Sequence, residues 1–482
     1  MILLGADAAY EQGCQHVAEG LWDAALKDFN AVLAERPDDW EALANRAVVY
    51  HRLGRFDQAL DDYCQALDRQ PKAPGLLINL AALLKELGQL GAAEGLLIQA
   101  LQLVPDHADG WSNLGLVRQH QRRYDDAAAC HIRAMELAGA SPARWTNLGN
   151  ALTGSLRLPD AIDAYRQALA LQSDFHEASY NQSIPLFMLG RYAEAWPLYE
   201  SRWRTILTPS FAGPRWQGEP LEAQTLLLWS EQGLGDCLQM ARFIPRLRAA
   251  HPSARLLFSC PVSLHRLFAD LADIELLAPD AQPEFDWQLP LASLPEVFDA
   301  RIDNLPLAPY FTPQSADAAQ WSARLPARQT GRLRVGLAWQ SGVWGVGVRD
   351  LMRQQKSIEA EALLPLLPLA DFVCLQPEPL PEVLRDRLFA PVIRDFADSA
   401  AIIANLDLVI SVDTAVAHLA GAMGCPVWVL MRQEGAPFFG VEGETAPWYP
   451  SARVLRQTEH GNWDAVLAQV AVMLASRQSG TR

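Results

Sequence analysis

The sequence has no excess of positive charge, no paired cysteine spacing and no long apolar run. Its net charge of -16 argues against nucleic acid or an anionic membrane as the main partner, because both would repel an acidic surface. The seven cysteines are odd in number and scattered, which favours reduced thiols over a disulfide framework. No stretch reaches the ~18 apolar residues of a membrane-spanning helix, and no basic segment precedes the short apolar run at the N-terminus. These absences predict a globular, cytoplasmic protein without an integral membrane segment.

Lysine is also scarce, although arginine is used freely. The chain contains only Lys27, Lys72, Lys85 and Lys356. A lysine at an arbitrary position is usually a solvated surface charge. Lys356 nevertheless stands alone in the C-terminal part of a chain that prefers arginine, which favours a role for a compact ammonium group, such as binding a diphosphate.

The N-terminal part contains an internal repeat of 34 residues. Small residues in register at this period are typical of tetratricopeptide repeats, each of which is a pair of helices. Because one pair cannot bury its apolar face alone, about six pairs are expected to stack into an all-α superhelix over residues 1–205. The repeated small residues are Ala25, Ala59, Ala93, Ala127, Ala161 and Ala195.

A second set of residues with the same period consists of asparagines, each 14 residues before the alanine of its repeat. A single asparagine is more often a solvated or loop-capping residue than a ligand group. Five in register favour a ladder of amides, whose donors and acceptors can bind a peptide backbone of any sequence. This pattern resembles the asparagine ladder of the O-GlcNAc transferase repeat domain, and the resemblance implies a polypeptide ligand. The asparagines are Asn45, Asn79, Asn113, Asn147 and Asn181.

An α/β pattern follows the repeats. Thr225–Trp229 has the composition of a buried strand, and a helix is expected to begin at Asp236. The turn that joins them contains Gln232, Gly233 and Gly235. Asp236 by itself is most simply a helix N-cap, because Gly-x-Gly turns before helices are common. The alternative is a carboxylate at a cleft, placed to act as a general base toward an acceptor hydroxyl.

A second α/β pattern begins with a strand at Val335. Residues 343–355 look like a loop that leads to Lys356, and an α-helix is expected over residues 359–367. Further along, Asp398 and Ser399 are expected to cap another helix. The strand at Val335 is expected to end in a polar, glycine-bearing turn that consists of Gln340, Ser341 and Gly342.

The segment from Asp407 to Leu430 combines a strand, a tight turn, a small-residue helix and a second strand. Asp413 and Thr414 occupy the helix N-cap region, where free N–H groups favour phosphate. In parallel sheets this end of a strand is where ligands bind. His418 lies one helical turn after Thr414. A histidine in an apolar helix is more often a core residue than a catalyst, but here we interpret it as support for the phosphate site.

Together these elements resemble the GT-B glycosyltransferases of the lipopolysaccharide heptosyltransferase family. The whole chain resembles bacterial proteins that fuse tetratricopeptide repeats to such a module. The motifs are Gly235-Asp236, Lys356 after a VGL-type strand, and Asp413-Thr414-Ala415 with His418. The resemblance implies a GT-B fold, in which two Rossmann-like halves face a cleft, with an acceptor half at residues 206–328 and a donor half at 329–482.

The resemblance further implies an inverting glycosyltransferase in which Asp236 is the base. Lys356, the Asp413 turn and the Gln340 turn would bind a nucleotide sugar as co-substrate. The repeats would hold a polypeptide acceptor, such as flagellin or another surface-structure subunit. No HxH, HExxH or DxD pair lies near these turns, so neither a metal nor a cofactor is predicted.

Two alternatives remain open. In the first, the enzyme acts on a glycan or a lipid-linked saccharide, and the repeats dock a partner. In the second, the chain is a peptide-binding adaptor with an inactive GT-B module. The second is favoured by the loops at 342–355 and 431–450, which are expected to contact the donor and which differ from those of the fusion proteins.

Overall fold

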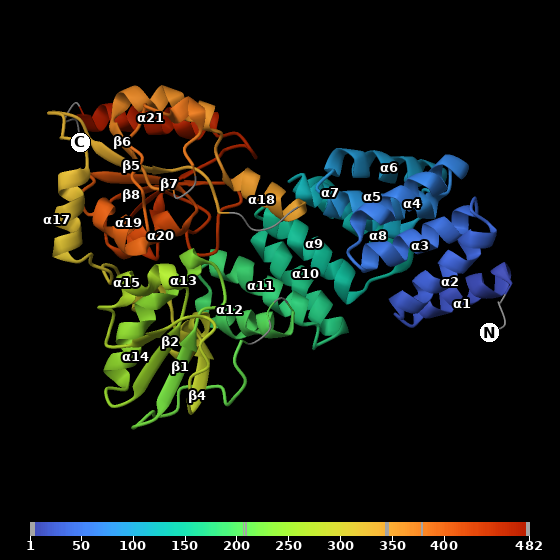
Figure 1. Ribbon diagram of the computed structural model, residues 1–482, viewed down its shortest axis with the longest axis horizontal. Coiled ribbons are helices and arrows are strands. Elements are labelled where there is room, and N and C mark those ends of the chain that lie inside the picture. The colour runs from blue at the N-terminus through green and yellow to red at the C-terminus, as the bar shows by residue number, and fades with distance from the viewer. Residues whose placement is uncertain (1–4, 206, 208–209, 343–346, 377–378, 479–482) are drawn as a thin grey trace. The chain divides into compact units, whose positions relative to one another are not determined.

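The computed structural model describes residues 5–205, 207, 210–342, 347–376 and 379–478 (Figure 1). The chain divides into two compact units. One unit comprises Met1–Ser155 with Gly345–Leu351, and the other comprises Leu156–Trp344 with Met352–Arg482.

The first unit consists of helix pairs, as the 34-residue period predicts. The repeated alanine is the fourth residue of the second helix in each pair, and it is fully buried wherever it occurs. Gly115 shows why small residues are needed on the facing helix, because a Cβ atom there would lie 2.5 Å from the His131 ring. The helices are α1 (Ala6–Ala18), α2 (Trp22–Glu35), α3 (Trp40–Arg52), α4 (Phe56–Arg69), α5 (Pro74–Glu86), α6 (Leu90–Leu103), α7 (Ala108–His120), α8 (Tyr124–Ala138) and α9 (Pro142–Gly154).

Successive first helices of the pairs contact one another along this unit. These contacts join α1 to α3, α3 to α5, α5 to α7, and α7 to α9. Stacked helix pairs of this kind curve into a superhelix with a concave face. The predicted all-α superhelix of tetratricopeptide type is therefore confirmed.

The second unit begins with the remaining helices of the repeat region, α10 (Leu158–Leu171), α11 (His176–Met188) and α12 (Tyr192–Tyr199), followed by the 3₁₀ helix η1 (Glu200–Arg204). These helices share one apolar core with the α/β elements that follow. The Trp196 indole N–H donates to the Ala300 carbonyl at 3.0 Å, and the Trp448 indole N–H donates to the Tyr192 hydroxyl at 2.6 Å. The sixth repeat is thus part of the body that contains the sheets.

The first sheet is parallel, with the strand order β3-β2-β1-β4. Its core strands are apolar, and residues Leu226 to Trp229 of β1 are all buried. The strands are β1 (Thr225–Trp229), β2 (Arg255–Ser259), β3 (Glu275–Leu277) and β4 (Trp287–Pro290). The helical elements are α13 (Leu234–Met240), η2 (Ala241–Phe243), α14 (Ile244–Ala250), η3 (Val262–Leu264), α15 (His265–Phe268), η4 (Leu291–Ser293), α16 (Leu294–Val297) and η5 (Ile302–Asn304).

The second sheet has the order β6-β5-β7-β8-β10-β9, in which only the β9–β10 pair is antiparallel among the described strands. Its strands are β5 (Arg334–Ala338), β6 (Asp371–Cys374), β7 (Leu408–Val412), β8 (Val427–Met431), β9 (Thr445–Ala446) and β10 (Tyr449–Arg456). Its helical elements are α17 (Ser315–Arg324), η6 (Ala360–Leu369), η7 (Glu382–Leu384), α19 (Phe396–Ile403), α20 (Ala415–Ala422) and α21 (Asp464–Gln478). Helix α18 (Val348–Lys356) is divided, because its residues up to Leu351 belong to the first unit and those from Met352 belong to the second.

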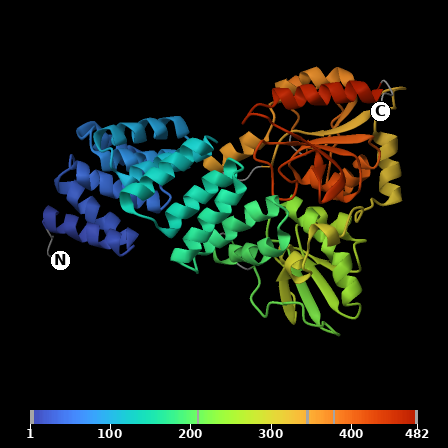
Figure 2. The same cartoon turned by 180° about the vertical axis from the view of Figure 1, so that it is seen from behind.

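Successive side chains of β7 point to opposite faces of the sheet, and both faces are covered. Leu408, Ile410 and Val412 pack with η6 and α21, whereas Val409 packs into the core that contains α19 and α20. Figure 2 shows α21 along the outer side of the sheet. The fold class predicted from the sequence, an all-α superhelix followed by an α/β region with two sheets, is confirmed.

Three local predictions were wrong. The segment predicted as a loop before Lys356 contains helix α18, which is consistent with good helix formers in DLMRQQK, and residues 343–346 lie outside the described part. The helix expected over 359–367 is the 3₁₀ helix η6, since Pro365 and Pro368 lack the N–H groups of an α-helix. The N-cap of α19 is Asp395, and Asp398 lies one turn further on.

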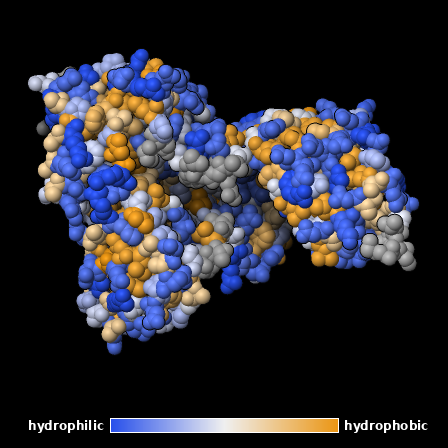
Figure 3. Space-filling view, viewed as in Figure 1, coloured by the Kyte–Doolittle hydropathy of each residue, from blue (hydrophilic) through white to orange (hydrophobic). Residues whose placement is uncertain are grey.

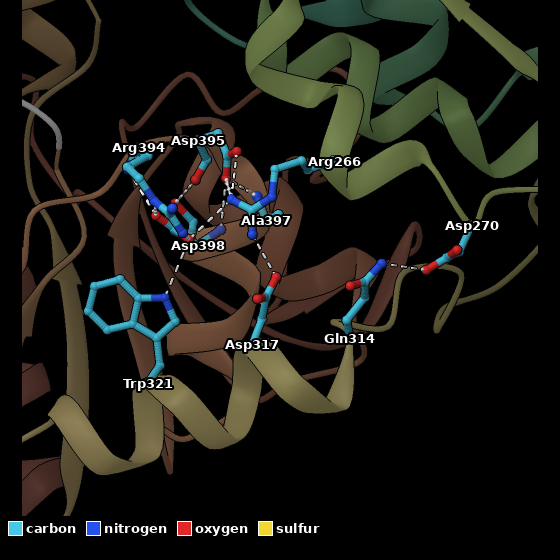
Figure 4. A network of polar contacts seen from close by, with 10 residues as sticks. Arg266, Asp270, Gln314, Asp317, Trp321, Arg394, Asp395, Ala397 and Asp398 are labelled. Atoms are coloured by element: carbon cyan, nitrogen blue, oxygen red, sulfur yellow. Dashed lines mark hydrogen bonds and ion pairs between the residues drawn. The ribbon is translucent and has the colours of Figure 1, made fainter.

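A charged network joins elements associated with both sheets (Figure 4). Arg266 of α15 binds Asp395 and Asp398 of α19, at 2.8 Å and 3.3 Å, and Asp317 of α17 at 2.6 Å. Asp398 is fully buried and also binds Arg394 at 2.7 Å. Hydrogen bonds from Arg394, together with the nearby Arg266, hold the pKa of the Asp398 carboxyl well below its usual range.

The surface mixes polar residues with separate apolar patches (Figure 3). The most exposed large apolar side chains, Val262, Val392 and Val472, lie far apart in the sequence. Within the part of the chain that the structure describes, no helix has the length and apolar character needed to cross a membrane.

Candidate active site

The turn between β1 and α13 brings Asp236 to the carboxyl end of the first sheet. Gly233 is the N-cap of α13, and its N–H donates to Asp236 Oδ2 at 3.1 Å. Asp236 is therefore the third residue of the helix, and its carboxylate accepts a hydrogen bond from the N–H of the N-cap residue, as in a capping box. Gly235 permits a close helix contact, because a Cβ atom there would lie 2.9 Å from the His418 ring and 3.6 Å from the Ala415 N atom.

The turn between β7 and α20 lies against this contact. Asp413 follows β7, and Thr414 is the N-cap of α20 by its backbone, although its hydroxyl pairs with Ser411 Oγ at 2.9 Å. Lys356, the last residue of α18, places its Nζ 2.9 Å from Asp413 Oδ2. His418 Nε2 lies 3.8 Å from Asp413 Oδ1, and its Nδ1 lies 3.0 Å from the Tyr449 hydroxyl. The turn thus gathers one cation, one carboxylate and one imidazole.

Burial and neighbouring charge set the protonation of these groups. Burial, followed by the Asp413 charge, raises the pKa of Asp236 to about 6, and Lys356 opposes this rise. Burial also raises the pKa of Asp413, but the nearby Lys356 and His418 lower it by more, so its net shift is downward. Burial lowers the pKa of His418 to about 4. At neutral pH both carboxylates are therefore mainly charged and His418 is neutral.

A cavity of about 240 Å³ connects these groups within the second unit. It contains five of the residues singled out from the sequence, which are Gln232, Asp236, Lys356, Asp413 and His418. The remaining lining residues are Tyr180, Ile184, Phe187, Tyr199, Gln239, Arg432, Gly435, Ala436, Pro437, Phe438 and Phe439.

Six of these eleven residues lie in the loop at 431–450, which the sequence analysis expects at the donor without naming single residues. The sequence analysis does not predict the other five, which are Tyr180, Ile184, Phe187, Tyr199 and Gln239. Arg432 directly follows β8, so the rule that ligands bind at the carboxyl ends of parallel strands is a signal that could have found it. Tyr180 and Ile184 carry no such signal, because apolar residues on a repeat helix look like ordinary packing residues.

The other predicted donor residues lie at the end of β5. The Gln340 N–H donates to Gln376 Oε1 at 2.7 Å, and the Ser341 N–H donates to Ser357 Oγ at 3.0 Å. Ser341 is buried and Gly342 is exposed. None of the three, nor Thr414, is among the described residues that line the cavity.

The asparagines of the ladder occupy the sixth position of α3, α5, α7, α9 and α11. Asn79 is exposed and the other four are half-buried. Asn45 donates to the Tyr10 hydroxyl at 2.9 Å. Asn45, Asn79, Asn113 and Asn147 belong to the first unit, whereas Asn181 belongs to the second unit, next to Tyr180. The predicted register therefore lies on the first helix of five of the six pairs, and the first pair has Glu11 at the equivalent position.

The cavity carries groups of both charge signs. The charged groups at the cavity are two carboxylates, Lys356 and Arg432, and the N-terminus of α20 adds N–H groups beside Asp413. Across the described ranges, no group of three or more His, Cys, Asp or Glu side chains is placed to hold a metal ion.

Comparisons with known proteins match two parts of the chain, the repeat region and a segment near the C-terminus. Tetratricopeptide repeat models match residues 10–74, 54–114, 111–142 and 146–206. The model of glycosyltransferase family 9 (heptosyltransferase) matches residues 393–465, which include Asp413, His418 and Arg432. The chain therefore carries tetratricopeptide repeats together with a glycosyltransferase family 9 region.

Protein FlbA of Caulobacter vibrioides is 28% identical over 323 residues, which are 60% of this chain and 53% of that protein. The chain thus spans about half the length of the curated relative it matches. Among solved structures, a thermophilic tetratricopeptide protein of Thermus thermophilus is 25% identical with a TM-score of 0.34, covering 38% of this chain and 99% of its own. A tetratricopeptide protein of Parabacteroides merdae is 19% identical with a TM-score of 0.37, covering 42% and 81%.

Proposed function

We propose that this protein is an inverting glycosyltransferase that moves a sugar from a nucleotide donor to a hydroxyl group of a polypeptide. The observation that carries the proposal is the meeting of Asp236 with the Lys356–Asp413 pair in one cavity of about 240 Å³, in a chain that matches glycosyltransferase family 9. A base for a hydroxyl and a cation for a phosphate are the two groups that such a transfer needs side by side.

Asp236 acts as the general base. With a pKa of about 6, it is charged at neutral pH and yet more basic than an ordinary carboxylate, which suits proton abstraction. The acceptor oxygen forms a bond to the anomeric carbon while the bond from that carbon to the donor phosphate breaks. The hydroxyl proton passes to Asp236, and the nucleotide leaves with the electron pair. One displacement from the opposite side inverts the anomeric carbon.

Lys356 and the N-terminus of α20 stabilise the charge that develops on the leaving phosphate. Lys356 is held by Asp413 at 2.9 Å, and Arg432 lines the same cavity as a second cation. Preorganised charges of this kind act without reorientation in the transition state. The role that a metal ion serves in other transferases is thus given to side chains and a helix dipole. We propose that the two sheets form the two halves of a GT-B fold.

The repeats supply the acceptor site. A concave superhelix with amides in register on the first helix of five of its six pairs suits an extended polypeptide. We propose a serine or threonine hydroxyl as the acceptor and flagellin or another surface-structure subunit as the acceptor class, modified in the cytoplasm. If the acceptor were a glycan or a lipid-linked saccharide, the amide register would serve only to dock a partner and would not hold the acceptor.

The test is the melting temperature of the full chain against a panel of nucleotides and nucleotide sugars, with Lys356→Ala in parallel. A ligand that binds the native state at a hundredfold excess over its dissociation constant stabilises it by ~2.7 kcal/mol. We expect one nucleotide family to raise the melting temperature of the wild type, and Lys356→Ala to reduce that rise. No rise with any nucleotide would support the adaptor alternative instead.

A further inference from the structure

We infer that the sixth repeat is a wall of the acceptor subsite and that it seats an apolar side chain next to the hydroxyl that receives the sugar. The wall consists of Tyr180 and Ile184 from α11 and Tyr199 from α12, with Gln239 of α13 as a backbone-binding amide. This inference rests on the proposed transfer to a polypeptide and adds the location and preference of the subsite.

The aromatic wall and the catalytic groups line the same cavity. Tyr180 and Ile184 are one helical turn apart on α11, so they share a face. The Tyr180 and Tyr199 rings lie 5.7 Å apart, and Phe187 behind them lies 5.1 Å from Phe438. The cavity therefore combines the charged groups around Lys356 with an apolar lining, which comes partly from the repeat and partly from residues 436–439 after β8.

The wall is fixed in place rather than loosely apposed. The Gln232 amide donates to the Tyr199 hydroxyl, which joins the wall to the turn that carries Asp236. Directly after α12, Arg202 is fully buried and pairs with Glu231 of the same turn at 3.0 Å. A subsite built on such anchored elements can discriminate between side chains.

Asp236 lies within electrostatic reach of both sides. Its charge contributes to the raised pKa values of Tyr180 and Tyr199, which are due first to burial, while on the other side it interacts with Asp413 and Lys356. In an in-line displacement the attacking hydroxyl and the leaving phosphate lie on opposite sides of the anomeric carbon. With phosphate at Lys356, the hydroxyl that Asp236 deprotonates must arrive from the side of the tyrosines.

Gln239 gives an independent sign of a missing ligand group. It lies three residues after Asp236, on the same face of α13, and it lines the cavity. Its side chain is 1% exposed, and its Nε2 has no hydrogen-bond partner among the described residues. A buried donor without a partner is destabilising, and a carbonyl oxygen of the bound backbone would supply that partner.

A polypeptide fits these features better than a saccharide. Helix α11, which supplies Tyr180 and Ile184, also carries Asn181, a member of the register of amides that suits a backbone. An extended backbone presents a carbonyl group for Gln239 and places side chains beside the modified residue. The apolar wall then favours acceptors with an aliphatic or aromatic residue next to the serine or threonine.

The experiment uses the full chain and an array of immobilised 15-residue peptides with a central serine and systematically varied flanks. A matched array with central alanine is the blank. Two signals are read, binding of the labelled protein and transfer of sugar from the nucleotide sugar that gives the largest rise in melting temperature. The variants are Ile184→Ser and Ile184→Asp, and the matched control is Ile132→Ser, at an exposed position on α8.

We expect the wild type and Ile132→Ser to prefer apolar flanks. We expect Ile184→Ser to lose that preference and at least tenfold of the transfer to those peptides, while the nucleotide sugar still raises its melting temperature. If both Ile184 variants kept the peptide preference and the transfer of the wild type, the inference would be overturned. It would also be overturned if the nucleotide sugar no longer raised the melting temperature of these variants, because the wall would then belong to the donor site. Binding preference without transfer by the wild type would overturn the proposed transferase and leave the peptide subsite supported.

Discussion

Lys356 Nζ lies 2.9 Å from Asp413 Oδ2, so the only lysine after Lys85 is held by the carboxylate at the end of β7. Both side chains are only 17% exposed. A partly buried pair of this kind holds the ammonium group in one orientation before a ligand arrives. The sequence analysis identifies each of these residues separately, and the structure shows that they are in contact.

The first prediction concerns the donor. Lys356→Ala should weaken nucleotide-sugar binding about tenfold or more, because a charge-assisted contact to phosphate is worth about 1.5–3 kcal/mol. Lys356→Arg should retain part of the affinity, since the charge remains but the compact ammonium is lost. The measurement is the dissociation constant by calorimetry. Equal affinity in all three proteins would remove Lys356 from the donor site.

The second prediction concerns the base. Asp236→Asn should lower the rate of transfer about 10²–10⁴-fold, the range typical of general-base catalysis. Donor affinity should change little, because the amide keeps the shape of the turn. The measurement is kcat separately from KM, with Asp280→Asn, an exposed carboxylate in the same half, as the matched control. Retained kcat in Asp236→Asn would contradict the assignment.

The third prediction is the pH dependence of transfer. Asp236 must be charged to accept a proton, and its pKa is raised to about 6. The rate should therefore be level above about pH 7 and fall tenfold per pH unit well below pH 6. A pH profile of kcat/KM checks this, and a profile that stays level down to pH 5 would point to a different base.

The fourth prediction is the effect of the same carboxylate on stability. Its pKa in the folded state, about 6, exceeds the ordinary 3.8, so the folded protein binds the proton more tightly than the unfolded chain. The contribution to stability is thus present below pH 3.8 and is lost as the pH rises through 6. Asp236→Asn removes this loss and should raise the melting temperature at pH 8 by more than at pH 5. If Asp236→Asn changed the melting temperature by the same amount at pH 5 and at pH 8, this prediction would be contradicted.

The fifth prediction concerns the network in Figure 4. Asp398 is fully buried and accepts hydrogen bonds from Arg394 and Arg266, so Asp398→Ala should lower the free energy of unfolding by about 2–4 kcal/mol. Because its pKa is depressed, its contribution is present above the ordinary value and is lost as the pH falls. Urea denaturation at pH 7 measures the change, and Asp299→Ala, in an exposed ion pair, should cost less than ~1 kcal/mol.

Much of the fold could be predicted because its signals are periodic. The alanines every 34 residues mark positions where helices touch, and short apolar, β-branched runs between aspartates mark strands such as β7. Helix α18 was missed because glycine and tryptophan just before it suggest a loop. The strand β4 was missed because four residues give too short a run to show a period.

Site residues could be predicted from the sequence where a charged side chain stands in an unusual sequence context, as Lys356 and Asp413 do. Tyr180, Ile184 and Gln239 could not be found, because their role arises from packing between segments far apart in the sequence. Each of their helices needs apolar residues for packing, so the same residue types are compatible with a hydrophobic core and with a binding surface.

The most direct test of the central claim is sugar transfer by the full chain to the serine-centred peptide array, with Asp236→Asn in parallel. The nucleotide sugar is the one that raises the melting temperature most, carrying a labelled sugar. The account predicts labelled serine peptides with the wild type, unlabelled alanine peptides, and at least a hundredfold loss with Asp236→Asn. No labelled peptide with the wild type, or equal labelling by the variant, would contradict it.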